Sequence, residues 1–150
     1  GHQLVIESLG KITSEKPSLT IVGEGSKNRK AYLENYAKKN NVSLNIISSI
    51  SDSQLAKEYL ESFTYVNGAQ NEPFGLTSLE AIGYGCNLVT NDTGGTKELA
   101  FFYKDKVFIS RNNSDDMSKK IVESLAYNSE TAPDMSNFSW DSVAQSIDML

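Results

Sequence analysis

SLTIVGEGSKNRKAYLENYAKKNN, residues 18–41, places a short apolar strand directly ahead of an amphipathic helix. The run at 18–26 is rich in β-branched residues and is stopped by Gly23 and Gly25, which predicts a buried strand and a tight turn. Residues 27–41 predict a helix whose apolar face is formed by Tyr32, Leu33, Tyr36 and Ala37. A buried strand that leads through a glycine turn into a helix is typical of α/β proteins.

The same alternation continues in both directions along the chain. Further strands are predicted at 42–50, 63–69, 86–92 and 106–112, and further helices at 3–12, 51–62, 114–128 and 139–150. Another helix is predicted after the loop that follows the strand at 63–69, and it ends at about Tyr84, with Gly85 as its C-terminal glycine. The helix at 51–62 opens with Ser51, Asp52 and Ser53, which are favourable N-cap residues. The pattern predicts one doubly wound, mostly parallel, Rossmann-like sheet with helices on both faces. Ligands bind at the carboxyl ends of the strands in such sheets. The loops of interest are therefore Gly23–Gly25, Ser48–Ser51, Gly68–Gly75 and Asn91–Gly95.

Composition excludes several classes of function. The 150 residues suffice for a single domain, and a hydrophobic content of 39% with 22% charged residues is ordinary for a globular protein. A net charge of −5 argues against a nucleic-acid-binding face. One cysteine and one histidine leave no disulfide framework and no soft-metal site, and they fit a cytoplasmic protein.

NEPFGLTSLEA, residues 71–81, carries two glutamates eight positions apart. Thr77 and Glu80 have the spacing of a T-x-x-E capping box, which would use both side chains to satisfy amides at a helix start. Glu72 precedes Pro73 at the mouth of the same helix, where free N–H groups favour an anion. It is either a partner of the helix dipole or an acceptor for sugar hydroxyls, and Gly75 permits close approach of a ligand.

Other motifs favour structural roles. VGEGS lacks the third glycine of a dinucleotide fingerprint, because Asn28 stands at that position. Asp115 and Asp116 follow Ser114 and are interpreted as helix-capping residues rather than metal ligands. Cys86 and Trp140 are interpreted as packing residues of the core.

Taken together, these segments resemble the retaining glycosyltransferases of the GT-B fold, the glycogen-synthase-like or group 1 family. EPFGLTSLEA matches the family's E-x7-E motif, with Glu72 and Glu80 as its glutamates. SLTIVGEGS is similar to the family's strand and V-G-x-G turn. LVTNDTGGTKEL resembles its strand and G-G-x-x-E loop, and FSWDSVA its Phe-Ser-Trp helix start. The resemblance covers nearly the whole chain.

The resemblance implies a role for each matching residue. Glu72 would contact the transferred sugar and act in catalysis, and Glu80 would accept hydrogen bonds from the ribose. The remaining donor-binding positions are Gly23 and Ile50 near the base, with Phe74, Gly75, Leu76 and Thr77 around the distal phosphate and the sugar. No metal and no cofactor is implied; the substrate would be a UDP-, GDP- or ADP-sugar.

The chain departs from the family pattern in ways that suggest half of a longer enzyme. It resembles the second, donor-binding domain, so we expect residues 1–150 to form one nucleotide-sugar-binding domain without the acceptor-binding N-terminal domain. The phosphate-binding Arg and Lys of the family would precede Gly1 and His2. We therefore expect the chain alone to be inactive. The longer enzyme would work in the cytoplasm or at the inner membrane face, on a glycan, a lipid or another acceptor.

Two other functions share this architecture. A nucleotide-sugar epimerase of the GT-B fold would alter the free sugar nucleotide without forming a glycosidic bond. A non-catalytic nucleotide-binding module would bind the same ligand without any reaction.

Overall fold

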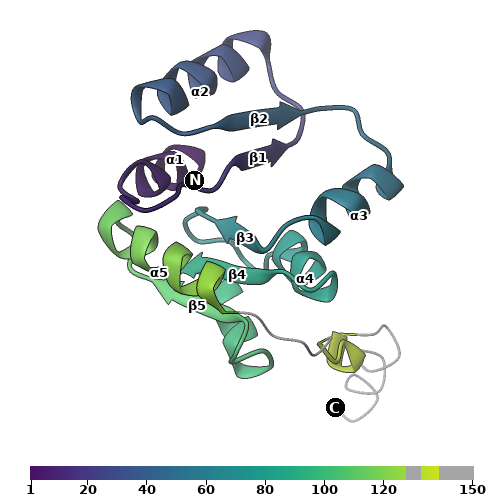
Figure 1. Cartoon of the computed structure of the whole chain (residues 1–150). Coiled ribbons are helices and arrows are strands. Elements are labelled where there is room, and N and C mark those ends of the chain that lie inside the picture. Colours follow the sequence, from purple (N-terminus) through teal and green to yellow (C-terminus); the bar gives the residue numbers. More distant parts are fainter. Residues whose placement is uncertain (128–132, 139–150) are drawn as a thin grey trace.

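The computed structural model describes residues 1–127 and 133–138, and their elements follow the predicted alternation (Figure 1). The predicted helix at 139–150, with Trp140, lies outside the described residues. The strands are β1 (Leu19–Val22), β2 (Leu44–Ile47), β3 (Thr64–Asn67), β4 (Asn87–Asn91) and β5 (Val107–Ser110). The helices are α1 (His2–Gly10), α2 (Lys27–Lys39), α3 (Asp52–Leu60), α4 (Leu76–Gly83) and α5 (Ser114–Ala126), with 3-10 helices η1 (Thr96–Phe101) and η2 (Ser136–Phe138).

Polar side chains begin three of the helices. Ser51, one of the N-cap residues expected from the sequence, caps α3, and it forms a complete capping box with Gln54. Ser26 caps α2 by accepting a hydrogen bond from the Arg29 amide. The cap of α5 is Asn113.

The predicted capping role of the two aspartates is therefore wrong. Asp115 Oδ1 lies 2.6 Å from Lys11 Nζ, and Asp116 Oδ2 accepts from the Arg111 amide at 2.8 Å. Both residues still lie in the first turn of α5, where their charge complements the helix dipole. Among the described residues, no cluster of three or more acidic, histidine or cysteine side chains is arranged to hold a metal.

All strand pairs are parallel, as predicted, but they form two sheets. β1 pairs with β2, with Leu19 beside Leu44, and β4 lies between β3 and β5, with Leu88 beside Tyr65 and Val107. The predicted single sheet is thus divided between β1 and β3. The arrangement of parallel strands joined by helices is nevertheless the expected α/β, Rossmann-like architecture.

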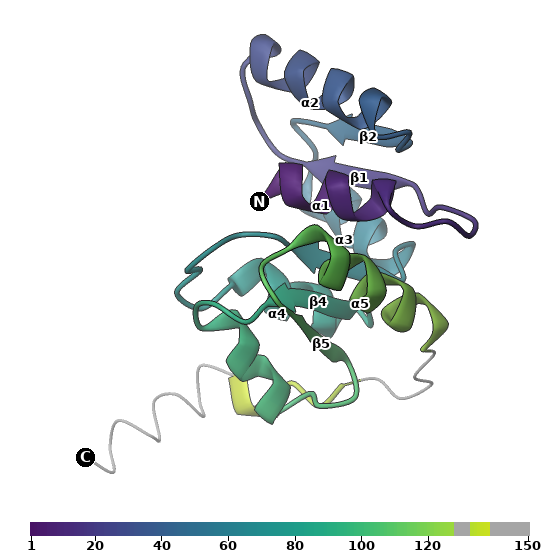
Figure 2. The same cartoon turned by 90° about the vertical axis from the view of Figure 1, so that its left-hand side faces the viewer.

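Helices cover both faces of the β3–β4–β5 sheet. Adjacent residues of a strand point to opposite faces, and Leu88 and Val89 of β4 enter different clusters. Val89 packs with α1 and α5, whose buried residues include Ile6, Leu9, Met117 and Ile121. Leu88 packs on the other side with Ile82 of α4 and Leu99 of η1. In Figure 2, α5 lies in front of this sheet and α1 lies between it and the β1–β2 sheet.

Candidate functional site

The start of α4 forms the centre of the candidate site. Its N-cap is Gly75, which has a left-handed backbone (φ 83°, ψ 60°), and no side chain caps the helix within the described part of the chain. A side chain at Gly75 would be strained, and its Cβ would lie 2.8 Å from Thr96 Oγ1. The amides of Ser78 and Leu79 donate to the Gly75 carbonyl at 2.9 and 3.1 Å. The amides of Leu76 and Thr77 precede them in the first turn, so they offer N–H groups at the positive dipole end of the helix to an anion.

The predicted capping box of Thr77 and Glu80 is wrong. Thr77 is the second residue of α4 rather than its cap, and its Oγ1 accepts a hydrogen bond from Tyr65 OH at 2.9 Å. Because the helix begins two residues earlier than a Thr77 cap requires, Glu80 is too far along the helix to reach back to its first amide. The structure therefore does not support a helix-capping role for Glu80.

Glu80 is exposed on the same face of α4 as Thr77. Its Oε2 lies 3.4 Å from the hydroxyl of Tyr59, whose ring stacks on Tyr84 with centroids 5.4 Å apart. Burial raises the pKa of Tyr59, and the phenolate that Tyr65 forms at high pH and the Glu80 carboxylate add to the rise. The Tyr59 hydroxyl consequently remains a donor at neutral pH, and the long contact leaves most of the carboxylate available to a ligand.

Glu72 lies half-buried in the loop before α4. The loop turns at Asn71, which has a positive φ of 56°, and the carbonyl of Glu72 accepts a hydrogen bond from the Gly95 amide at 2.8 Å. Burial raises the pKa of Tyr65, and the charges of Glu72 and Glu80 both contribute to that rise. The two glutamates of the motif thus lie near the same tyrosine.

Gly94 and Gly95, in the loop after β4, pack against the backbone of the Glu72 loop. A Cβ added to Gly94 would lie 2.5 Å from the carbonyl oxygen of Glu72, and one added to Gly95 would lie 1.9 Å from that of Pro73. The loops after β3 and β4 are therefore packed backbone to backbone. The Asn91–Gly95 loop is one of the loops of interest in the sequence, and its adjacent glycines are the signal for this supporting role, which was not predicted.

Polar atoms beneath these loops have unmet hydrogen-bonding capacity. Asn91 Oδ1, Thr93 Oγ1 and Thr96 Oγ1 are buried and have no partner among the described residues. Other polar groups fasten the region: Asn67 Nδ2 donates to Ser78 Oγ at 3.2 Å and Asn91 Nδ2 to the Ala69 carbonyl at 3.1 Å. Buried polar atoms of this kind are commonly satisfied by ordered water or a ligand.

The other predicted site residues occupy two separate positions. Phe74 and Leu76 flank Gly75 with exposed side chains, and the Phe74 ring packs 6.0 Å from that of Phe138. Gly23 and Ile50 follow the carboxyl ends of β1 and β2, the strands of the other sheet. The Gly23 amide donates to the Ile47 carbonyl at 2.9 Å. The predicted residues therefore belong to different sheets.

The loops at the Gly23 end are held together by Glu24. Its Oε1 accepts from the amide and the hydroxyl of Ser49, both at 2.8 Å. These hydrogen bonds lower the pKa of Glu24, so its carboxylate is charged at neutral pH. Ser48 Oγ donates to the Gly23 carbonyl at 3.1 Å, which links the loop after β1 to the loop after β2.

The parallel α/β fold defines a Rossmann-like domain, in which the uncapped start of α4 lies beside two glutamates. Residues 1–139 match the family described as glycosyl transferases group 1, and the chain belongs to that family. In the part of the chain that the structure describes, no helix has both the length and the apolar character to cross a membrane.

One relative is similar in sequence, and two solved structures share the fold. A glycogen synthase from Mycoplasma mobile is 29% identical over 107 residues, which are 71% of this chain and 22% of the relative. Sucrose-phosphate synthase from Thermosynechococcus elongatus superposes with a TM-score of 0.78 at 18% identity, over 99% of this chain and 41% of the other. HepE from Anabaena, solved in complex with UDP and glucose, gives 0.74 at 16% identity, over 100% and 45%. The chain thus spans less than half the length of these three relatives.

Proposed function

We propose that the chain is the nucleotide-sugar donor-binding domain of a retaining glycosyltransferase. The uncapped start of α4, placed between Glu72 and Glu80, is the observation that supports this proposal most strongly. A helix N-terminus suits the diphosphate of the donor, and carboxylates suit the hydroxyl groups of ribose and sugar. The UDP and glucose bound to HepE are ligands of this chemical class.

The proposed mechanism assigns the first-turn amides of α4 to the leaving group. Transfer from a nucleotide sugar releases a nucleoside diphosphate, so negative charge grows on the distal phosphate as the glycosidic bond breaks. The amides of Leu76 and Thr77 would stabilise that charge. Glu72 would stabilise the positive charge that develops at the anomeric carbon, and retention of configuration is inferred from the family resemblance.

The rest of the polypeptide would supply the acceptor. Because this chain corresponds to 22% of the glycogen synthase and to 41% and 45% of two solved relatives, we place the acceptor-binding domain outside it. A glycan or a lipid at the cytoplasmic membrane face would then meet the donor between the two domains.

Binding of a nucleoside diphosphate tests the proposal directly. We expect one of UDP, GDP or ADP to raise the melting temperature of the longer protein and to bind with one-to-one stoichiometry in calorimetry. Adenosine and uridine should bind far more weakly, because they lack the phosphates that would bind at the start of α4. Equal binding of nucleoside and nucleoside diphosphate would contradict the proposed role of the helix start.

Replacing Glu80 by Ala should weaken this binding more than it destabilises the fold. The lost charged hydrogen bond to ribose is worth about 1.5–3 kcal/mol, which is about tenfold or more in affinity. The fold loses only the 3.4 Å contact with Tyr59. Titration calorimetry and thermal melting of the same sample measure the two effects.

Tyr59→Phe is the matched control for Glu80→Ala. It removes the hydroxyl that contacts Glu80 and leaves the carboxylate in place, so the affinity should change less than about threefold. If Tyr59→Phe weakens binding as much as Glu80→Ala does, Glu80 acts through the tyrosine and not on the ribose.

A further inference from the structure

Tyr65 and Asn67 of β3 both bind the first turn of α4. Side chains two positions apart on a strand point to the same face of the sheet, and these two point toward α4. Tyr65 OH donates to Thr77 Oγ1 at 2.9 Å, and Asn67 Nδ2 donates to Ser78 Oγ at 3.2 Å. Two consecutive hydroxyl groups of the helix are therefore each bound by a side chain of the same strand.

The two hydrogen-bonded pairs differ in their exposure to a ligand. Asn67 and Ser78 are both buried, so their hydrogen bond joins the strand to the helix and nothing else. Thr77 is exposed, and it is the second residue of α4. Its hydroxyl therefore lies at the surface, on the same residue whose amide the proposed mechanism assigns to the leaving group.

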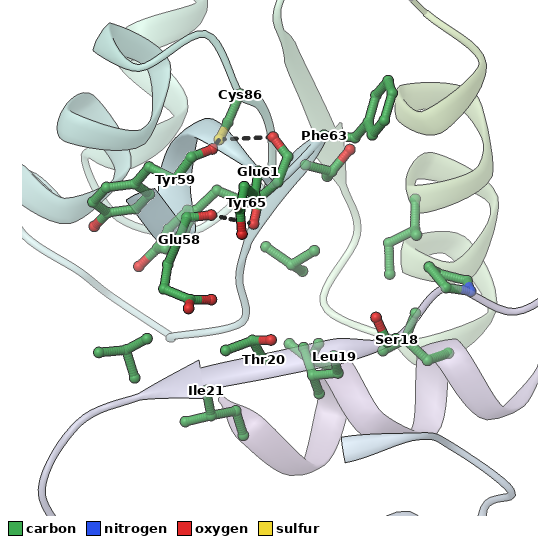
Figure 3. A pocket seen from close by; sticks show the side chains of 18 of the residues that line it. Ser18, Leu19, Thr20, Ile21, Glu58, Tyr59, Glu61, Phe63, Tyr65 and Cys86 are labelled. Carbon is green, nitrogen blue, oxygen red and sulfur yellow. Dashed lines mark hydrogen bonds between the residues drawn. The ribbon is translucent and has the colours of Figure 1, made fainter. Parts of the chain in front are cut away.

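The ring of Tyr65 is held in place by its neighbours. It packs against the core residues Ile82 and Leu88, and it lies in the wall of a cavity of about 680 Å³ that Thr77 also lines. Figure 3 shows Tyr65 beside Tyr59, and the centroids of the two rings are 6.1 Å apart. Because packing leaves such a ring few alternative rotamers, the position of the Tyr65 hydroxyl is fixed by the fold.

The direction of the hydrogen bond leaves the Thr77 proton available to a ligand. A phenol is more acidic than an aliphatic alcohol, so Tyr65 OH donates and Thr77 Oγ1 accepts. Burial raises the pKa of Tyr65, so the phenol keeps its proton at neutral pH. The proton of the Thr77 hydroxyl has no acceptor within residues 1–127 and 133–138. A hydroxyl that already accepts a hydrogen bond is polarised, which makes it a stronger donor.

A further hydroxyl group lies beside the same helix start. Thr96 is 1% exposed, and its Oγ1 has no hydrogen-bond partner in the described part of the chain. This atom lies 2.8 Å from the position that a Cβ on Gly75 would take. Buried hydroxyl groups are normally paired, so the unpaired one at the N-cap of α4 indicates independently that a polar group from outside the chain binds here.

We propose that Tyr65 is a positioning residue for the donor diphosphate, because it holds the Thr77 hydroxyl so that this hydroxyl donates to the distal phosphate. The inference rests on the proposed function, since it requires a phosphate at the start of α4. Thr77 then binds that phosphate twice, through its amide and through its hydroxyl. Tyr65 touches no atom of the ligand and acts only through Thr77. The pair consequently favours nucleoside diphosphates over monophosphates, which lack the distal phosphate.

A double-mutant cycle of Tyr65→Phe and Thr77→Val tests this inference by titration calorimetry of the longer protein. The ligands are whichever of UDP, GDP and ADP binds most tightly and the matching monophosphate. Thr77→Val keeps the amide and the shape of the residue, and it should weaken diphosphate binding about tenfold or more, because the lost hydrogen bond is to a charged group. Tyr65→Phe should weaken it about threefold or more in the parent and leave it unchanged in the Thr77→Val background.

The monophosphate and two further variants serve as controls. Affinity for the monophosphate should change less than about twofold in every variant. Thr77→Ser keeps the hydroxyl and should bind the diphosphate within about threefold of the parent. Tyr84→Phe removes a tyrosine hydroxyl at the other end of α4 and should bind it like the parent.

Two results would overturn the inference while leaving the proposed function intact. One is a cycle in which the losses from Tyr65→Phe and Thr77→Val simply add, because the tyrosine then does not act through the threonine. The other is an equal loss of diphosphate and monophosphate affinity in Tyr65→Phe, which is the effect of a disturbed fold. A parent protein that binds the two nucleotides equally well would contradict the proposed function of the α4 start, and the inference with it.

Discussion

Replacing Glu72 by Gln is expected to lower the turnover of the longer enzyme by about 100-fold or more, with normal folding. The amide can still hydrogen-bond to sugar hydroxyls, but it cannot offset positive charge at the anomeric carbon. An interaction that is stronger in the transition state than in the ground state appears in the catalytic rate constant. Affinity for the free nucleoside diphosphate should therefore stay close to that of the parent.

Steady-state kinetics at saturating donor measures this effect, and Glu61→Gln is the control. Glu61 is an exposed carboxylate at the end of α3 that pairs loosely with Lys57 at 3.6 Å, so its replacement removes the same charge away from the α4 loop. Its turnover should match the parent. If Glu72→Gln also stays within a few-fold of the parent, Glu72 only complements the helix dipole, an effect of about 0.3–1 kcal/mol on stability.

Gly95→Ala is the second substitution for which we expect a large effect. Its Cβ would lie 1.9 Å from the Pro73 carbonyl oxygen, so the backbone of one loop must move. The movement also disturbs the 2.8 Å hydrogen bond from the Gly95 amide to the Glu72 carbonyl. A displacement of about 1 Å in a catalytic group can cost about 100-fold in rate, and we expect a turnover loss of that order.

Gly85→Ala separates loop displacement from a general loss of stability. Gly85 has a positive φ of 98°, so alanine should cost about 1–2 kcal/mol there, but its Cβ would meet nothing within 4 Å. We expect this variant to melt earlier and to turn over normally at a temperature where it is folded. Equal turnover losses in both variants would show that the Gly95 effect comes from stability alone.

Much of the fold could be predicted because its signals are local. The helix predicted at 27–41 is observed at Lys27–Lys39, and all five strands lie within their predicted segments. Ser51 and Gln54 form a capping box because both partners lie within one turn. Gly85, expected after the end of α4, has the left-handed backbone that suits a helix C-terminus.

The features that sequence reasoning missed depend on partners far away in the chain. The spacing of Thr77 and Glu80 fits a capping box. In the structure, however, Tyr65 OH donates to the threonine hydroxyl, and the N-cap of the helix is Gly75, which precedes Thr77. The support of the Glu72 loop by Gly94 and Gly95 requires contacts across more than twenty residues. The division between β1 and β3 is invisible locally, because each strand alone is an ordinary apolar run.

The backbone contact between the loops after β3 and β4 also limits how this domain can be redesigned. The Glu72 carbonyl, the Pro73 carbonyl and the glycines at 94 and 95 leave no room for an independent change of path in either loop. To transfer the donor preference of a relative to this domain, both loops therefore have to be exchanged together. Libraries that randomise residues 71–75 alone will be enriched in misfolded chains, whereas paired libraries keep the mutual fit and sample substrate choice.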